Sequence, residues 1–402
     1  MLSANKASAR RLYSFTTVLM LASCTSKVTH DFLRPFLKSI TRPQGKALLA
    51  FIKAMIQGKT SVLCQMGREV QKNIMPKSFC EKMGRHLEKI KDLHLKPLLL
   101  APKTGWELII VDSVDVQKPY AETLPWIHTI RDGSTGNLYG KGFGVYGVIG
   151  KHKSEGYLPL ALSRYEEEKP GFMQLVDTIL GTLSPDHGAL WVLDRGFDDL
   201  KVFTKLLDNH QGFLVRLDRA GGDRCLVTSD GEKHRVGVLL QHFEGKDVGY
   251  RIVHLPGRAE PLALIHYQHK KHGQGLALLT TQIPKTEKQA IRTAKLYLKR
   301  WKVEDYFRFI KQRFGIECLM IQLEDRLDGL LAGILIASAL VMKLMQSVPI
   351  EMKAVYEGFL KKNRAKVSWS SFARFLSDCY DEWTLIFRTY VPPDKPLALA
   401  PF

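Results

Sequence analysis

The chain has 402 residues, of which 45% are hydrophobic and 25% are charged, and its formal net charge is +19. This length predicts two or three domains, and the composition is that of a soluble globular protein with an ample core. The six cysteines are scattered without a C-x-x-C pair, which argues against a zinc finger or a disulfide scaffold and favours a reducing cytoplasm.

The positive charge is concentrated in two parts of the chain. Residues 1–100 contain 18 Lys and Arg against 5 Asp and Glu, and residues 285–313 contain 10 against 3. A mild excess could serve solubility alone, but two basic blocks favour a polyanionic partner such as nucleic acid.

The first hundred residues have the apolar spacing of short helices. We expect helices at Phe32–Ile40, Lys46–Ile56, Ser61–Val70 and Ser78–Ile90. Clustered Lys and Arg on small helices are typical of a DNA-contacting module, and the alternative is a helical cap on the next domain.

From Trp106 the pattern changes to strands and helices of a mixed α/β sheet. Strands are predicted at 107–112, 142–150, 157–163, 189–194 and 212–217, with helices at 171–183 and 197–209. Gly142, Gly144 and Gly147 formally match a dinucleotide-binding fingerprint, but without a strand-to-helix turn they favour a glycine-rich strand.

Five regions follow from these patterns. They are a basic helical DNA-binding region (1–100), the first part of a catalytic core (101–217), a β-rich insertion (218–282), the remainder of the core (283–345) and a C-terminal helical region (346–402). The apolar run from Leu330 to Met342 is shorter than the roughly 20 residues that span a bilayer, so we expect a buried helix and no membrane association.

Two predicted strands deliver a carboxylate at their ends, Asp112 and Asp194, although Asp115 competes with Asp112. Adjacent buried strands bring such acids to one edge of a sheet. The basic helix 297–311 adds Glu304. Three converging acids repel one another and therefore favour divalent cations, with oxygen ligands suited to Mg²⁺ or Mn²⁺. Two such ions about 4 Å apart can promote phosphoryl displacement.

On that helix, Tyr297, Arg300, Glu304 and Lys311 fall within about 60° of one another. The stripe suits a metal ligand flanked by phosphate-binding groups, and the alternative is a solvated face with ordinary ion pairs. Arg308 lies nearly on the stripe and is a further candidate phosphate contact.

The spacing Tyr-(2)-Arg-(3)-Glu-(6)-Lys of these four residues resembles the signature of bacterial DDE transposases of the insertion-sequence-4 type. Asp112 in Val-Asp-Ser-Val-Asp and Asp194 in Val-Leu-Asp-Arg-Gly resemble the first and second acids of that family. The resemblance covers about residues 105–345. It implies a ribonuclease-H-like catalytic core with a β-rich insertion before the third acid.

The resemblance also implies roles. Asp112, Asp194 and Glu304 would hold two Mg²⁺ ions, Tyr297 and Arg300 would hold phosphates, and Lys311 would contact DNA. The implied reaction is cleavage at the terminal inverted repeats of an insertion sequence and joining to target DNA. Relatives stack a displaced base on an aromatic residue, for which 276–281 has no Trp.

Cutting two ends in concert implies at least a homodimer on double-stranded DNA, with the C-terminal helices as candidate subunit contacts. The expected location is the bacterial cytoplasm, at the nucleoid when the protein is bound to DNA. The alternatives are a catalytically inactive, transposase-derived DNA-binding protein and a DNA nuclease without strand transfer.

Overall fold

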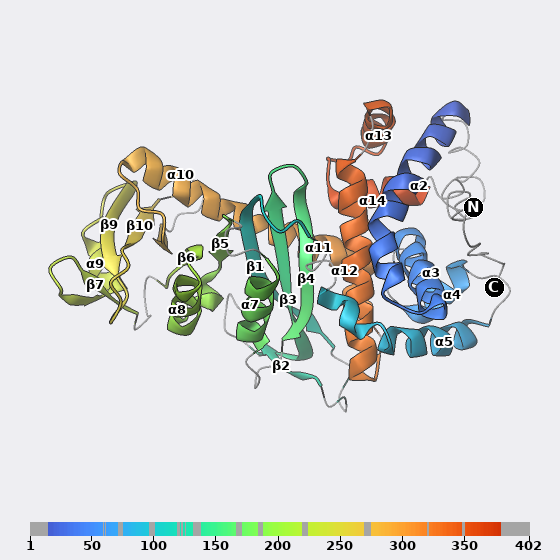
Figure 1. Ribbon diagram of the computed structural model, residues 1–402, viewed down its shortest axis with the longest axis horizontal. Coiled ribbons are helices and arrows are strands. Elements are labelled where there is room, and N and C mark those ends of the chain that lie inside the picture. Colours follow the sequence, from blue (N-terminus) through green and yellow to red (C-terminus); the bar gives the residue numbers. More distant parts are fainter. Residues whose placement is uncertain are drawn as a thin grey trace.

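The computed structural model shows a large mixed α/β sheet with helices on its faces and a mainly helical body at one end (Figure 1). It describes residues 15–378, apart from 59, 61, 71–74, 96–100, 119–120, 122–123, 125, 132–137, 166–170, 184–187, 219–223, 269–274, 320 and 348–349. Parts of the predicted first and last regions, 1–14 and 379–402, lie outside the described residues.

Eleven strands of the described chain join in one sheet. They are β1 (Trp106–Gln117), β2 (His128–Arg131), β3 (Leu138–His152), β4 (Gly156–Tyr165), β5 (Leu190–Leu193), β6 (Gly212–Arg216), β7 (Cys225–Thr228), β8 (Lys233–Arg235), β9 (Val248–His254), β10 (Leu262–Tyr267) and β11 (Leu276–Thr280). The order is β2-β3-β1-β5-β6-β11-β10-β9-β7-β8, with β4 also paired to β3. The glycines of the apparent dinucleotide fingerprint lie within β3, as the strand interpretation predicts.

The sheet changes its pairing mode along its width. β3 is antiparallel to β1, β2 and β4, whereas β1, β5 and β6 run parallel to one another. The predicted β-rich stretch continues this same sheet. β11 pairs antiparallel with β6, β10 pairs with β11, and β9 pairs with β10.

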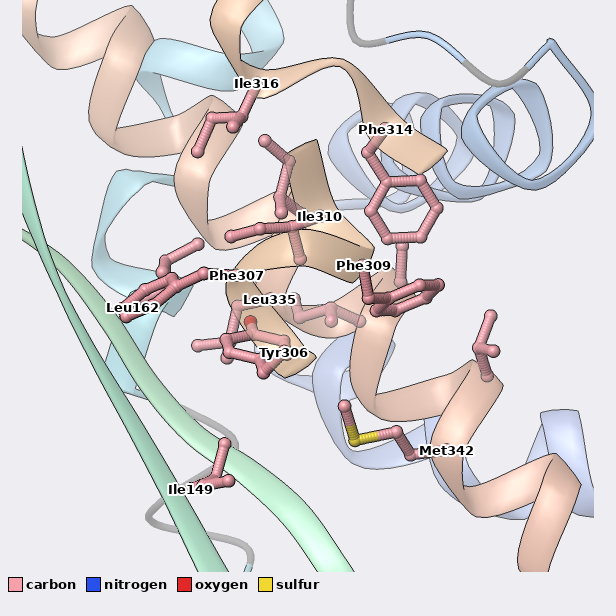
Figure 2. Packing of buried hydrophobic residues seen from close by; sticks show 14 of the residues in the cluster. Ile149, Leu162, Tyr306, Phe307, Phe309, Ile310, Phe314, Ile316, Leu335 and Met342 are labelled. Carbon is pink, nitrogen blue, oxygen red and sulfur yellow. The ribbon is translucent and has the colours of Figure 1, made fainter. Parts of the chain in front are cut away.

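Each face of the sheet has its own core. One core contains α7 (Gly171–Thr182), α8 (Leu200–Asp208) and α9 (Val236–Gln241). The other contains α10 (Glu287–Tyr297), α11 (Trp301–Phe314) and α12 (Glu324–Gln346). Figure 2 shows the second core, in which Phe307 of α11 lies beside Leu162 of the sheet and Phe309 lies beside Phe314 on the side of α11 away from the strands.

The helical body consists of α2 (Phe15–Lys38), α3 (Arg42–Gly58), α4 (Leu63–Val70), α5 (Pro76–Glu88), α13 (Ile350–Lys362) and α14 (Trp369–Asp378). It packs around α12, which contacts α2, α3, α5 and α14. The four predicted helices of the first hundred residues are present, but the first begins far earlier than Phe32.

Helix α12 contains the predicted apolar run. By length and composition it could cross a membrane, yet 89% of its most apolar window is buried inside the protein. It is therefore a central core helix, as the sequence predicts, and it contacts both the sheet and the helical body.

The basic segment 297–311 was expected to be one regular helix, and this expectation was wrong. Helix α10 ends at Tyr297, a 3₁₀ turn η3 covers Leu298–Arg300, and α11 begins at Trp301. A 3₁₀ turn has three residues per turn instead of 3.6, so the side chains on either side of it are rotated relative to a single α-helix. The break brings Tyr297 and Arg300 to the site described below.

Candidate active site

Neighbouring parallel strands place two aspartates side by side. In the β1–β5 pairing Val111 lies opposite Leu193, so the next residues, Asp112 and Asp194, continue the same register. Asp112 was expected to end its strand, but β1 runs on to Gln117, because β3 still pairs with it there. What ends at Asp112 is the parallel pairing with β5, and the two carboxylates lie at that point.

The alternation of side chains in β1 distinguishes Asp112 from its competitor. Asp112 lies on the same side of the strand as Leu108 and Ile110, which belong to the core covered by α11. Asp115 is three residues further on, and an odd separation places its side chain on the opposite face. The choice of Asp112 over Asp115 is thus favoured by the period of the strand.

Helix α11 approaches the sheet closely at the position opposite Asp112. The β3 residue paired with Asp112 is Gly147, and a Cβ there would lie 2.6 Å from Cε1 of Phe307. The missing side chain lets the Phe307 ring lie against the sheet. Because Glu304 precedes Phe307 by nearly one turn of α11, this contact positions the third acid.

Arg300 joins the three acids. Its Nη1 lies 2.5 Å from Asp112 Oδ2, its Nη2 lies 2.7 Å from Glu304 Oε1, and its Nε lies 3.7 Å from Asp194 Oδ1. The side chain is only 8% exposed. Burial alone lowers the pKa of the Arg300 guanidinium, but the carboxylates around it raise that pKa above its ordinary value, so Arg300 stays charged.

Tyr297 completes the group. Its hydroxyl donates a hydrogen bond of 2.7 Å to Asp194 Oδ1. Burial and the neighbouring Asp194 raise the pKa of Tyr297 far above its ordinary value, so the phenol remains a donor. Burial raises the pKa of Asp194 in turn, but Arg300 and the Tyr297 hydrogen bond outweigh it and hold that pKa below its usual value.

Asp112 behaves differently from Asp194. Burial raises its pKa to about 6 in spite of the charge on Arg300, and repulsion from Asp194 and Glu304 adds to the increase. One guanidinium faces three carboxylates, so the fully ionised cluster carries two negative charges in excess. The single positive charge of Arg300 therefore does not balance the charge of the three carboxylates.

Two predicted site residues lie outside this cluster. Lys311 Nζ forms a 2.8 Å ion pair with Glu317 and donates a hydrogen bond to the carbonyl oxygen of Asp115. Arg308 is exposed and pairs with Asp305 on its own helix. Of the seven predicted residues, the structure brings five together: Asp112, Asp194, Tyr297, Arg300 and Glu304.

Sequence reasoning overlooked Arg216. In the β5–β6 pairing Leu193 lies opposite Val215, so Arg216 follows in register beside Asp194. Burial raises the pKa of Asp194, whereas Arg300 and the Tyr297 hydrogen bond lower it. The positive charge of Arg216 lowers that pKa further, by a smaller amount. The same strand-end position that identified the aspartates would have identified this residue.

The donor chemistry of the cluster fits a hard divalent cation, because all three acids offer carboxylate oxygens. Within the described residues, however, no group of three His, Cys, Asp or Glu is arranged to hold a metal ion. The acids converge on Arg300 instead, and the buried Arg300 Nε has no hydrogen-bond partner. The excess negative charge leaves the site fitted for a cation.

A comparison with protein families finds one match for this part of the chain. Residues 107–340 match the model of the transposase DDE domain. This range includes all three acids and the helices that carry Tyr297 and Arg300. No curated protein matches the chain.

Proposed function

Because the chain belongs to the transposase DDE domain family, we propose that it is a transposase of the insertion-sequence-4 type, which moves an insertion sequence by cutting and pasting DNA. The observation that carries the proposal is the convergence of Asp112, Asp194 and Glu304 on Arg300, with Tyr297 bound to the second acid. These residues come from three separate parts of the chain and include three of the four signature positions.

The proposed catalytic core is ribonuclease-H-like and consists of residues 101–217 and 283–345, with 218–282 as the β-rich insertion. The mixed pairing of β3, β1, β5 and β6, and the two aspartates on adjacent parallel strands, support it. The basic helices of 1–100 would bind the terminal inverted repeats. The region 346–402 would contact a second subunit on the DNA.

Asp112, Asp194 and Glu304 would hold two Mg²⁺ or Mn²⁺ ions. When bound, the ions would help to activate the attacking oxygen and to stabilise the leaving oxygen of a DNA phosphodiester. The excess of two negative charges at the cluster supports this assignment.

Arg300 and Tyr297 would orient the phosphate. A guanidinium offers several N–H donors in one plane, and phosphate oxygens are its preferred acceptors after carboxylates. Lys311, beside the same strand as Asp112, would contact DNA next to the reacting phosphate, and Arg308 would add an outer contact.

The test is cleavage and joining in vitro with Mg²⁺. The substrate is a plasmid that carries the coding segment of this chain with its natural flanking DNA, because the ends recognised must lie in those flanks. We expect Glu304→Gln to lower cleavage by about 100-fold or more, since it removes a carboxylate required at the reacting phosphate.

Asp305→Asn is the matched control, because Asp305 neighbours Glu304 on α11 but pairs with Lys302 and Arg308 outside the cluster. It should cleave at the wild-type rate. Full cleavage by Glu304→Gln would show that the assignment of the acids is wrong. Binding without cleavage by the wild type would indicate an inactive DNA-binding protein, and cleavage without joining would indicate a nuclease.

A further inference from the structure

Helix α10 carries a row of cations on its solvent face. Lys288, Arg292 and Lys295 of α10 are exposed and, at about 100° per residue, lie within roughly 60° of one another, and the exposed Lys299 follows them in the 3₁₀ turn η3. The buried residues of the helix, Ala290, Thr293, Ala294 and Tyr297, lie on the opposite side. We call these four cations the α10 basic row.

Among the described residues none of the four forms an ion pair. Other cations of the chain are paired, as Arg258 is with Asp208 and Glu260. Lys151 chiefly, and Lys299 more weakly, lower the pKa of Glu107, but Lys299 makes no direct contact with that carboxylate. The row therefore presents positive charge that the protein itself does not neutralise.

The row also borders a shallow hollow of about 330 Å³. Its lining combines the four cations with two partly buried apolar side chains: Lys288, Ile291, Arg292, Lys295, Leu296 and Lys299. From Lys288 to Lys299 the row is about 16 Å long at 1.5 Å per residue. Roughly five phosphates of one DNA strand span that distance.

We propose that the α10 basic row binds the phosphate backbone of double-stranded DNA without regard to base sequence. The inference rests on the proposed function, since it supposes that duplex DNA reaches this chain. A row of cations without ion pairs on one helix face complements a regular array of phosphates, and Lys and Arg contacts to phosphate carry no sequence information directly.

The row contacts a part of the DNA that does not react. Tyr297 ends the same helix and points from its other side to Asp194, so α10 itself separates the row from the carboxylates. Figure 1 shows α10 extending from the strands β9 and β10 to α11, on which Glu304 lies. DNA held along this helix would thus be tethered beside the site while another of its phosphates reacts.

The test is a triple variant, Lys288→Ala, Arg292→Ala and Lys295→Ala, in the full chain. Lys299 stays, because it adjoins Arg300. Alanine is the strongest helix former, so the exposed helix should fold as before. Binding to a fluorescent duplex of random sequence is measured by anisotropy between about 50 and 200 mM salt.

Each phosphate contact contributes about 0.9 to the slope of log affinity against log salt concentration. We expect the variant to lose about 2.7 from that slope and to bind about 100-fold more weakly at about 150 mM salt. The matched control removes three exposed lysines from elsewhere on the surface, by Lys201→Ala, Lys233→Ala and Lys246→Ala, and should keep the wild-type slope.

If the triple variant binds random duplex with the wild-type slope, the inference is wrong. The row is then either only solvated or a site for an acidic protein. If the wild type cleaves its plasmid substrate in that case, the proposed function stands. If the wild type binds no duplex DNA at any salt concentration, both proposals are wrong. If the control variant loses as much slope as the triple variant, the effect is one of total charge and the inference is also wrong.

Discussion

Replacing Gly147 by alanine should displace helix α11. The backbone of Gly147 lies opposite Asp112, and the new Cβ would be 2.6 Å from Cε1 and 2.7 Å from Cζ of Phe307. Carbon atoms in contact lie about 3.5–4.0 Å apart, so the ring must move by about 1 Å. Neither partner can yield easily, because Gly147 is inside a strand and Phe307 is 5% exposed in the core.

The cost follows from this overlap. Forcing an extra carbon into a packed core destabilises a protein by about 1–3 kcal/mol, and alanine returns about 0.5–1 kcal/mol because glycine in a strand loses more chain entropy. We expect a net loss of about 1–2 kcal/mol in the free energy of unfolding. A shift of about 1 Å at Glu304, which precedes Phe307 on α11, should lower plasmid cleavage by about 100-fold.

The measurements are denaturant unfolding and the cleavage assay, with two accompanying variants. Gly181→Ala is the control, because a Cβ at this position in α7 meets nothing within 4 Å and should leave both quantities unchanged or raise stability slightly. Gly147→Ala combined with Phe307→Leu removes both clashing atoms, so the two changes should be coupled by at least about 1 kcal/mol.

A Gly147→Ala variant that cleaves normally would show that the contact with Phe307 does not position Glu304. If Phe307→Leu worsened the loss additively, the clash would not be its cause.

Two further predictions concern ionisation and oxidation. The pKa of Asp112 is raised from 3.8 to about 6, so the folded protein keeps a proton that the unfolded chain has released, and stability is lost as the pH rises through this range. The Asp112→Asn variant has no carboxyl group to titrate and so does not lose stability in this way. Its free energy of unfolding, relative to that of the wild type, should increase by about 3 kcal/mol between about pH 4 and pH 7. A difference that does not change with pH would contradict the raised pKa. Cys64 Sγ and Cys80 Sγ lie 2.8 Å apart, so peroxide should convert exposed Cys64 to a sulfenic acid that condenses with Cys80, releasing water and forming a disulfide. Intact-mass analysis should show the loss of two hydrogens, reversed by dithiothreitol and abolished in Cys80→Ser, and unchanged mass in the wild type would show that the thiols do not meet.

Local patterns were enough to find the elements that carry the site. Short apolar runs before Asp112 and Asp194 predicted buried strands, because only a strand covered on both faces is apolar throughout. Adjacency of the two strands then followed from the usual arrangement of an α/β sheet, and β1 and β5 are indeed neighbours. Helical spacing similarly brought Arg300 and Glu304 together, since residues four apart share a face.

Contacts between distant segments could not be predicted in this way. The sequence around Gly147 does not indicate that Phe307, 160 positions later, packs against this glycine. The 3₁₀ turn at Leu298–Arg300 has ordinary helix-forming residues, so the break reflects tertiary contacts of Arg300 and not local propensity. The continuation of the sheet through β11 also depends on a pairing between residues far apart in the chain.

The position of Arg300 changes how its variants should be interpreted. As a buried cation it compensates three acids, and removing one partner of a buried ion pair costs about 3–5 kcal/mol because the remaining charge is left uncompensated. As the donor proposed for a DNA phosphate, it would also be required for the reaction. Arg300→Ala would therefore lose activity for either reason. Only a charge-preserving change such as Arg300→Lys separates them: lysine keeps the compensation but has no planar set of donors. A folded Arg300→Lys protein that binds DNA but cleaves poorly would assign the guanidinium to the phosphate.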